Sequence, residues 1–320
     1  MNLWILQRRP SDLLEPYEWT RLREEARELN VNVEIVAPAD IDLIVSGGGR
    51  RAIRRCGVEV DLPDAVLPRT GSFTDYFSLA ILRQCEQLGV EVINSSQSIE
   101  AVKDKLFAHQ ILSQNKLPIP RTMLVRFPVD VDLVAQQIGF PCVVKLLVGS
   151  FGEGVLLSRD AADFRDLMEL LASLDRSQAV ILQQYISHRP GQDLRVWVIG
   201  GRVLGAMLRR STDGSFKANI SRGGDGVAHP LNAEIERIAL ACASVLQLDI
   251  AGVDLLFDHD SYCVCEVNSA PGFSGFEAAT GINVAREILG HALDRTRRPS
   301  RPFAVRQHRH SQQPQGCFAR

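Results

Sequence analysis

The sequence has no run of about 18 apolar residues of the kind that spans a bilayer. Its first residues, 1–5, enter a strand-like pattern directly and lack the charged leader and cleavage site of a secretory signal. Both absences predict a soluble, cytoplasmic protein without a membrane partner.

The sequence also lacks a cysteine pattern typical of disulfides and a complete set of zinc ligands. The seven cysteines are odd in number, scattered and mostly embedded in apolar runs, which is typical of reduced thiols in a reducing compartment. Cys263 and Cys265 lie two apart on an expected strand, yet no second Cys or His pair completes a zinc set. Neither a disulfide framework nor a zinc site is therefore predicted.

Neither sign of charge dominates the chain, because 36 Lys and Arg residues against 38 Asp and Glu residues give a net charge of -2. The folded body thus has no overall bias toward nucleic acid. The residues after Asp294 differ, since they are rich in Arg, His, Pro, Gln and Ser and contain no acid. We predict a disordered basic tail over 294–320, with binding to RNA or an acidic partner as the alternative.

At 320 residues the chain is long enough for two or three modest domains that share a cleft. Strand and helix patterns, such as 3–6 and 17–29, alternate up to residue 94 and predict a parallel α/β domain. Polar residues at 94–96 then cap one helix expected over 99–112.

Beyond residue 121 the pattern changes to antiparallel strands with helices to one side, as in an α+β region. A glycine-rich turn at 149–154 joins two strands, a loop segment extends to Pro230, and a helix over 232–246 precedes a final hairpin. The expected domains are 1–94, 95–178 and 179–293, followed by the tail.

The final hairpin, 251–268, carries two acids on facing strands. If a three-residue loop spans 259–261, Asp254 lies opposite Glu266, and Asn268 shares the face of Glu266. Two opposed carboxylates repel one another unless a cation lies between them, so we predict that these three residues bind magnesium. Acids facing solvent on an open sheet are the alternative, but the abrupt polar turn that follows favours the mouth of a site.

A lysine interrupts the apolar strand 143–148 directly before the glycine-rich turn. Because a buried ammonium needs an anion, Lys145 is expected to meet a phosphate, which the backbone N–H groups of the turn can also approach. An ordinary hairpin explains the turn alone equally well, and no Walker motif is present. Gly47, Gly48 and Gly49 likewise form no G-x-G-x-x-G, which argues against a dinucleotide oxidoreductase.

A third set of residues suits a nucleotide. The strand end at Gln184 and Tyr185 offers backbone groups to an adenine edge, and Asp193 can accept from a ribose hydroxyl or cap a turn. A cationic group follows that can neutralise phosphates and a carboxylate, or form a solvated basic face: Arg209, Arg210, Lys217, Asn219 and Arg222.

The order of these motifs resembles the ATP-grasp superfamily, and specifically the RimK-type α-L-glutamate ligases. The resemblance extends from Met1 to about Leu293 and rests on these segments: Lys145 with its glycine turn, Gln183-Gln184-Tyr185, Asp193-Leu194-Arg195, Lys217-Ala218-Asn219, Ser221-Arg222-Gly223-Gly224, Ala251-Gly252-Val253-Asp254 and Glu266-Val267-Asn268-Ser269-Ala270-Pro271-Gly272-Phe273. It implies a parallel pre-ATP-grasp domain and a nucleotide held between two α+β subdomains.

The resemblance also implies residue roles. The residues implied in ATP binding are Lys105, Lys145, Gly149, Ser150, Gly152, Gly154, Gln184, Tyr185, Asp193, Lys217 and Asn219. Asp254, Glu266 and Asn268 would hold two magnesium ions, with manganese as the alternative. Arg209 and Arg222 would act on the γ-phosphate or a substrate carboxylate, and Asn268 is counted with them as a catalytic residue. The sequence departs from the family at Gln184, at Lys217 and at Val148, where RimK has Glu, Arg and an acid.

The implied reaction forms an acyl phosphate from ATP and an acceptor carboxylate, which the amine of an amino acid then displaces. L-Glutamate is the expected donor, and a protein C-terminus, peptide or small molecule the acceptor, in a homo-oligomeric enzyme. Three alternatives remain: another amino acid or a carrier-protein acceptor, a phosphotransferase, and a nucleotide-responsive binding protein.

Overall fold

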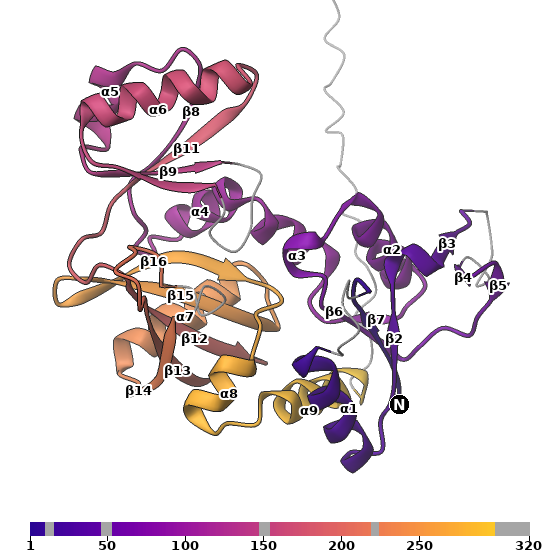
Figure 1. Ribbon diagram of the computed structural model, residues 1–320. Helices are drawn as coiled ribbons and strands as arrows, with labels where there is room; N and C mark the ends of the chain where they lie inside the picture. The colour runs from indigo at the N-terminus through magenta and orange to yellow at the C-terminus, as the bar shows by residue number, and fades with distance from the viewer. Residues whose placement is uncertain (10–15, 46–52, 147–153, 219–223, 298–320) are drawn as a thin grey trace, which may run out of the picture.

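A computed structural model describes residues 1–9, 16–45, 53–146, 154–218 and 224–297 (Figure 1). The N-terminal domain is built on a four-stranded parallel sheet of order β2-β1-β6-β7. Its strands are β1 (Asn2–Leu6), β2 (Asn32–Val36), β6 (Ala65–Pro68) and β7 (Glu91–Val92). The predicted parallel α/β domain is therefore confirmed.

Both faces of this sheet are covered by helices. Trp4 and Leu6 of β1 pack toward α2 (Tyr76–Gln87), whereas Leu3 and Ile5 pack toward α1 (Tyr17–Glu28) and the final helix α9 (Val284–Arg297). Since alternate strand residues face opposite sides, both sets are apolar, as a buried parallel sheet requires. The C-terminal helix thus joins the core of the N-terminal domain.

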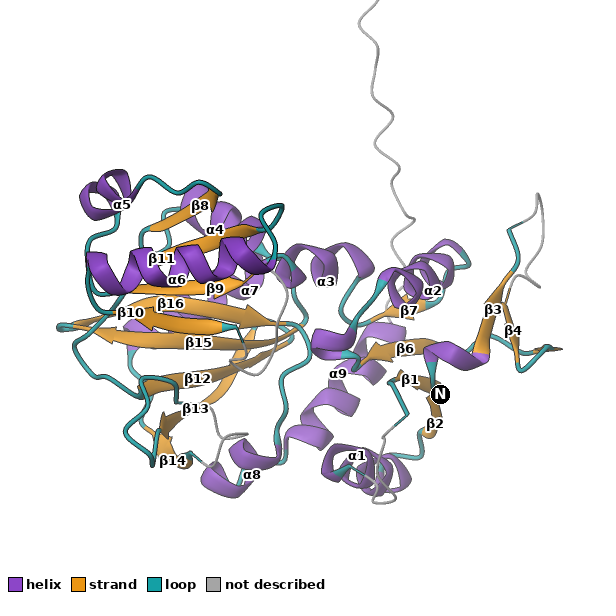
Figure 2. Cartoon of the chain, turned by 45° about the horizontal axis from the view of Figure 1, so that its top comes forward, coloured by secondary structure: helices purple, strands orange, loops and turns teal. Residues whose placement is uncertain are grey.

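A small antiparallel sheet projects from this domain (Figure 2). It consists of β3 (Ile41–Leu43), β4 (Ile53–Arg55) and β5 (Val58–Glu59), with the 3-10 turns Pro38–Asp40 and Gly71–Phe73 nearby in the domain. The sequence predicts none of these strands, because each is too short to show an alternating pattern.

The single helix predicted over 99–112 is wrong. The chain forms α3 (Ser96–Lys103), capped by Ser95 as expected, and then α4 (Lys105–Gln114). Asp104 lies between them in an extended conformation and accepts a hydrogen bond from the backbone N–H of Phe107. An N-cap residue has a non-helical backbone, so Asp104 ends one helix and starts the next.

The central subdomain is a four-stranded sheet of order β10-β9-β11-β8 with α5 and α6 on one face (Figure 1). All its strand pairs are antiparallel. Its elements are β8 (Thr122–Arg126), α5 (Val131–Gln137), β9 (Cys142–Leu146), β10 (Val155–Ser158), α6 (Ala161–Leu174) and β11 (Ala179–Gln184).

The C-terminal subdomain is a five-stranded antiparallel sheet of order β14-β13-β12-β15-β16. Its elements are β12 (Gln192–Ile199), β13 (Arg202–Arg210), β14 (Asp225–His229), α7 (Ala233–Val245), β15 (Ile250–Asp258), β16 (Ser261–Asn268) and α8 (Ser274–Thr280). β14 lies where the sequence predicts only loop. The parallel domain followed by two antiparallel sheets confirms the predicted fold class.

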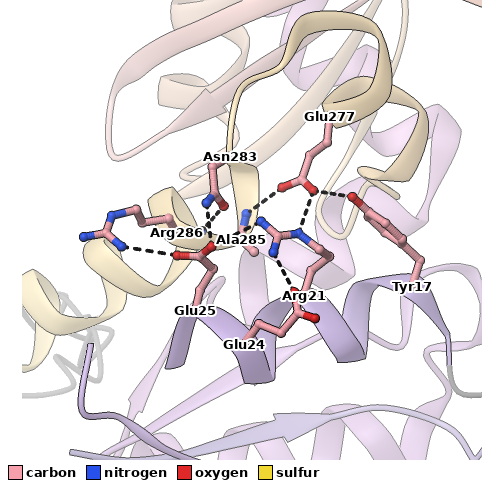
Figure 3. Close-up of polar contacts among 8 residues, drawn as sticks. All are labelled: Tyr17, Arg21, Glu24, Glu25, Glu277, Asn283, Ala285 and Arg286. Carbon is pink, nitrogen blue, oxygen red and sulfur yellow. Dashed lines mark hydrogen bonds and ion pairs between the residues drawn. The ribbon is translucent and has the colours of Figure 1, made fainter. Parts of the chain in front are cut away.

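The N- and C-terminal domains are joined by polar contacts between α1 and the segment of α8 and α9 (Figure 3). Glu277 accepts hydrogen bonds from the Tyr17 hydroxyl at 2.7 Å and from Arg21 at 3.2 Å. Glu25 accepts from Asn283 at 2.6 Å. The side chain of Asn94, which is 1% exposed, makes four further hydrogen bonds to backbone groups of residues 249, 250 and 269.

Helix α9 continues through Arg297, so residues 294–297 of the predicted tail are helical. Arg295 forms ion pairs with Asp249 and with Glu91, which ties this last turn to both domains. Residues 298–320 lie outside the described part of the chain. Among the described helices, none combines the length and the hydropathy needed to cross a membrane.

Candidate active site

One face of the five-stranded sheet changes from apolar to charged along its strands. Leu194 and Val196 of β12 face the core under α7, which leaves the alternate residues on the opposite face. There, Trp197 packs in the core shared with the N-terminal domain, and Arg195 and Asp193 follow it toward the strand start. The charged half of this face holds the candidates Asp193, Arg209, Asp254, Glu266 and Asn268. Arg210 follows Arg209 on β13 and therefore lies on the opposite face.

The predicted pairing of Asp254 with Glu266 is confirmed, although the predicted loop is wrong. The turn contains two residues, His259 and Asp260, since Asp258 pairs with Ser261. If pairing continued regularly from this two-residue turn, Asp254 and Glu266 would be out of register by one residue. A bulge between Leu255 and Asp254 restores the pairing, because one extra residue of β16 is accommodated there.

Two arginines neutralise Asp254, which is 1% exposed. Arg195 contacts both carboxylate oxygens, with Nη2 at 2.6 Å from Oδ2, and Arg209 Nη2 lies 2.9 Å from Oδ2. Burial alone would raise the pKa of Asp254, but the two guanidinium groups outweigh burial and lower it. The positive charge that the sequence assigns to magnesium is therefore already supplied in part by the chain itself.

Arg209 is shared between two carboxylates. Its Nε and Nη2 atoms donate to Asp193 at 2.6 and 2.7 Å, in addition to the contact with Asp254. Both Asp193 and Arg209 are buried. The side chain proposed for the ribose is thus held in a bidentate ion pair, which fixes the orientation of the arginine.

Arg195 is the residue of this array to which the sequence assigns no role. The signal was present, because Asp193 and Arg195 lie two apart on one strand and so share a face. Each lies opposite a residue of opposite charge on a neighbouring strand: Asp193 opposite Arg209 of β13, and Arg195 opposite Asp254 of β15.

The oxygen atoms available to a cation come from Glu266 and Asn268. Both side chains are half-buried, and Asn268 Nδ2 donates to Glu266 Oε1 at 3.2 Å, so that no described residue donates to the Asn268 amide oxygen. Asp254 makes two hydrogen bonds with Arg195 and one ion-pair contact with Arg209, and a carboxylate has about four lone-pair sites, so it retains capacity for one more ligand.

This donor chemistry fits magnesium, which takes one or two protein carboxylates and completes its shell with water and phosphate. In the described ranges, no group of three or more His, Cys, Asp and Glu side chains forms an all-protein cage. Any metal bound here therefore depends on substrate oxygens as well.

Lys145 extends from β9 toward this charged face. It lies opposite Val155 and Ile181, is 8% exposed, and has no described carboxylate within 4.0 Å. Its ammonium counteracts the effect of burial on the pKa of the Cys265 thiol, which is nevertheless raised to about 12. Lys145 and the hairpin that bears Glu266 therefore approach one another across the two subdomains.

His109 of α4 is a buried residue that the sequence analysis did not single out. Its Nδ1 atom lies 2.8 Å from the Lys105 carbonyl oxygen, so it carries the hydrogen, and Nε2 accepts from Gln183 Nε2 at 3.1 Å. Burial, reinforced by Lys145, lowers the pKa of His109 from 6.5 to about 4. The neutral ring thus fixes the start of α4 to β11 beside Lys145.

Acidification should destabilise the protein through His109. Between pH 6.5 and about pH 4 the unfolded chain binds a proton at this ring that the folded chain does not, so the free energy of unfolding falls as the pH falls. The slope from one such group approaches about 1.4 kcal/mol per pH unit. Denaturant unfolding at about pH 7 and about pH 5 should show a smaller loss for His109→Gln than for the wild type. Equal losses would contradict this role.

The candidate adenine residues lie beside the segment that carries Lys217. The half-buried Tyr185 ring meets Phe216 edge-on at 6.2 Å, and burial raises the pKa of the Tyr185 hydroxyl. The Gln184 backbone N–H donates to the Arg121 carbonyl at 2.9 Å. The structure thus brings Tyr185 and Lys217 to one end of the central sheet.

Other sequence candidates are only partly described. Gly154 ends the glycine-rich turn at φ +68°, where a Cβ would lie 3.2 Å from the Leu146 side chain, so the position favours glycine. Lys105 is half-buried at the start of α4. The candidates that lie outside the described residues are Gly149, Ser150, Gly152, Asn219 and Arg222.

Comparison with known proteins agrees with this fold. Residues 102–292 match the RimK-like ATP-grasp domain, and residues 1–99 match the RimK PreATP-grasp domain. A probable alpha-L-glutamate ligase 1 of Shewanella amazonensis is 34% identical over 290 residues, covering 90% of this chain and 94% of its own length.

Two solved structures share the fold at 20% identity. The ATP-grasp ligase PsnB complexed with minimal precursor, Mg and ADP superposes with a TM-score of 0.69, covering 92% of this chain and 98% of its own. A RimK domain protein ATP-grasp from Sphaerobacter thermophilus also gives 0.69, covering 91% and 99%. Both comparisons include the N-terminal domain as well as the two antiparallel subdomains.

Proposed function

The chain belongs to the RimK-like ATP-grasp family of carboxylate-amine ligases, and on this premise we propose that it adds L-glutamate to an acceptor carboxylate in an ADP-forming reaction. The acceptor class that we propose is a protein C-terminus, a peptide or a small molecule. The observation that carries the proposal is the approach of Lys145, which has no described carboxylate within 4.0 Å, to the acidic side chains of the C-terminal sheet.

The proposed nucleotide position lies between the two antiparallel subdomains. Lys145, with no described carboxylate partner, would bind ATP phosphates, while Gln184, Tyr185 and Asp193 would lie toward the base and ribose. Glu266, Asn268 and the remaining site on Asp254 would hold magnesium, which when bound neutralises charge on the β- and γ-phosphate oxygens. PsnB was solved with Mg and ADP, which supports this cofactor pair.

The chain's own residues would act by position and charge. Arg209 is held by Asp193 and Asp254, so its guanidinium needs no reorganisation when negative charge develops nearby. A carboxylate that attacks the γ-phosphate and an amine that displaces the acyl phosphate are both supplied by substrates. No side-chain nucleophile is required, and correct placement of the reactants supplies much of the rate.

The test is ADP release by the purified full-length chain with ATP, magnesium, L-glutamate and a short glutamate-terminated peptide. We expect release that requires both the amino acid and the peptide, and a peptide product lengthened by one glutamyl residue in mass spectrometry. Release that needs the peptide but no amine would instead indicate a phosphotransferase. Release with another amino acid only would change the donor and retain the ligase chemistry.

Lys145→Met should weaken binding of a non-hydrolysable ATP analogue by at least about tenfold, because a charge-assisted contact to phosphate is lost. Methionine retains the apolar stem within β9, so the melting temperature should change little. Calorimetric titration measures the affinity, and Lys103→Met, at an exposed residue on α3, is the matched control. Unchanged affinity in Lys145→Met would remove this lysine from the nucleotide site.

A further inference from the structure

Arg69 is a buried arginine to which none of these roles applies. It directly follows the last residue of β6 and is 8% exposed. The other buried arginine in the described ranges, Arg209, is 5% exposed and contacts two carboxylates. Arg69 has no carboxylate within 4.0 Å among the residues that the structure describes. Unlike Arg209, it therefore forms no ion pair with the described residues.

The side chain of Arg69 reaches from the N-terminal sheet to the segment that follows the proposed metal ligands. Its Nη2 atom donates to the Pro271 carbonyl oxygen at 2.7 Å, and its guanidinium carbon lies 5.6 Å from the centre of the Phe273 ring. Pro271 is itself fixed against β15, because a Cβ on Gly252 would lie only 2.7 Å from the Pro271 Cβ atom. Arg69 is therefore held against the segment that directly follows β16.

Joining the two domains does not explain this arginine. The same junction already has the Glu277 and Glu25 contacts of Figure 3, the four hydrogen bonds of Asn94, and the ion pairs of Arg295. A neutral donor would suffice for a hydrogen bond to a backbone carbonyl. A buried cation at this position adds a desolvation cost, and no described carboxylate lies within 4.0 Å to offset it.

The electrostatic state of Arg69 favours an anionic ligand. Burial lowers its pKa from 12.5 to about 10, with Glu18 opposing this change, so the group remains charged at neutral pH. A guanidinium has five N–H donors, and the described residues engage one of its nitrogens. Arg69 also lies at the carboxyl end of a parallel strand, where ligands of open α/β sheets bind.

We propose that Arg69 binds a substrate carboxylate at the junction between the N-terminal domain and the segment 269–273. This inference rests on the proposed ligase function, whose two organic substrates both carry a carboxylate that does not react. One is the α-carboxylate of the incoming amino acid, and the other is the side-chain carboxylate of a terminal acceptor glutamate. A planar guanidinium matches either group in geometry and charge.

The experiment compares substrates with and without each carboxylate. In one arm, L-glutamate is compared with its α-amide as donor, and in the other, a peptide ending in glutamate is compared with the same peptide ending in glutamine. The preference is the ratio of kcat/KM for the substrate with the carboxylate to kcat/KM for its amide analogue. For one of these two pairs we expect Arg69→Gln to reduce this ratio at least tenfold relative to the wild type, while KM for ATP stays within about twofold. The arm that changes identifies the carboxylate.

Two further variants separate binding from folding. Arg69→Lys retains the positive charge and should show a smaller loss of preference, which gives a readout if Arg69→Gln does not fold. Arg286→Gln removes an exposed arginine that pairs with Glu25 across the same junction and should leave both preferences unchanged. Unchanged preferences in the Arg69 variants would overturn the inference alone, whereas a wild type without amino-acid-dependent ADP release would overturn the proposed function.

Discussion

Asp254→Asn should lower the free energy of unfolding of the metal-free protein by about 3 kcal/mol, because it breaks a buried ion pair from one side. Arg195 loses the one carboxylate that the described residues give it, and Arg209 retains only Asp193. The new amide also places an NH₂ group beside guanidinium donors. Urea unfolding in the presence of a chelator measures the change.

The matched comparison is Glu266→Gln on the facing strand. Glu266 is half-buried and forms no ion pair with the described residues, so the free energy of unfolding should change by no more than about 1 kcal/mol. Two acids that face one another on adjacent strands should thus differ strongly in their contribution to stability. Equal effects would show that Asp254 does not depend on its arginines.

Glu266→Gln should nevertheless lower turnover at saturating magnesium by at least about a hundredfold. Glu266 is the candidate metal-binding carboxylate that forms no ion pair with a described arginine, and glutamine removes its negative charge while retaining its size. The expected loss is of the order seen when one electrostatic contact to a transition state is removed. ADP release with ATP, glutamate and acceptor measures it, alongside a metal-free melting curve.

Two outcomes would contradict this assignment. A Glu266→Gln protein that melts much earlier but turns over normally would identify Glu266 as a structural acid. A loss of turnover that excess magnesium fully restores would mean that Glu266 tunes the metal affinity and has no separate effect on the chemical step. The combination of near-normal melting and a persistent loss of turnover supports the proposed metal site.

Four charged side chains of the candidate site form one connected array. Asp193, Arg209, Asp254 and Arg195 form a continuous series of ion pairs across three strands. Such an array fixes donors and acceptors in place before substrates arrive, which is the condition for electrostatic catalysis at low reorganisation cost. Three members of this array, Asp193, Arg209 and Asp254, are also residues proposed to act in the reaction.

In the hairpin 251–268, the sequence predicts the correct pairing of Asp254 with Glu266 from an incorrect loop length. Period-two alternation placed Glu266 and Asn268 on one face, and the structure agrees. The loop length and the bulge were both missed, and their effects on the register cancel. Bulges have no reliable signature in a single sequence, because they arise where twist and packing of neighbouring strands require an extra residue.

The sequence by itself determined the parallel N-terminal domain, the change to antiparallel sheets and the candidate residues of the hairpin, because these depend on apolar periodicity and on neighbours along one strand. It did not show that Asp254 is neutralised by Arg195 and Arg209, or that Arg69 reaches Pro271. Those contacts join residues far apart in the chain. Only the tertiary structure sets which charges share a buried space, and burial determines whether a charge needs a partner from the protein or from a ligand.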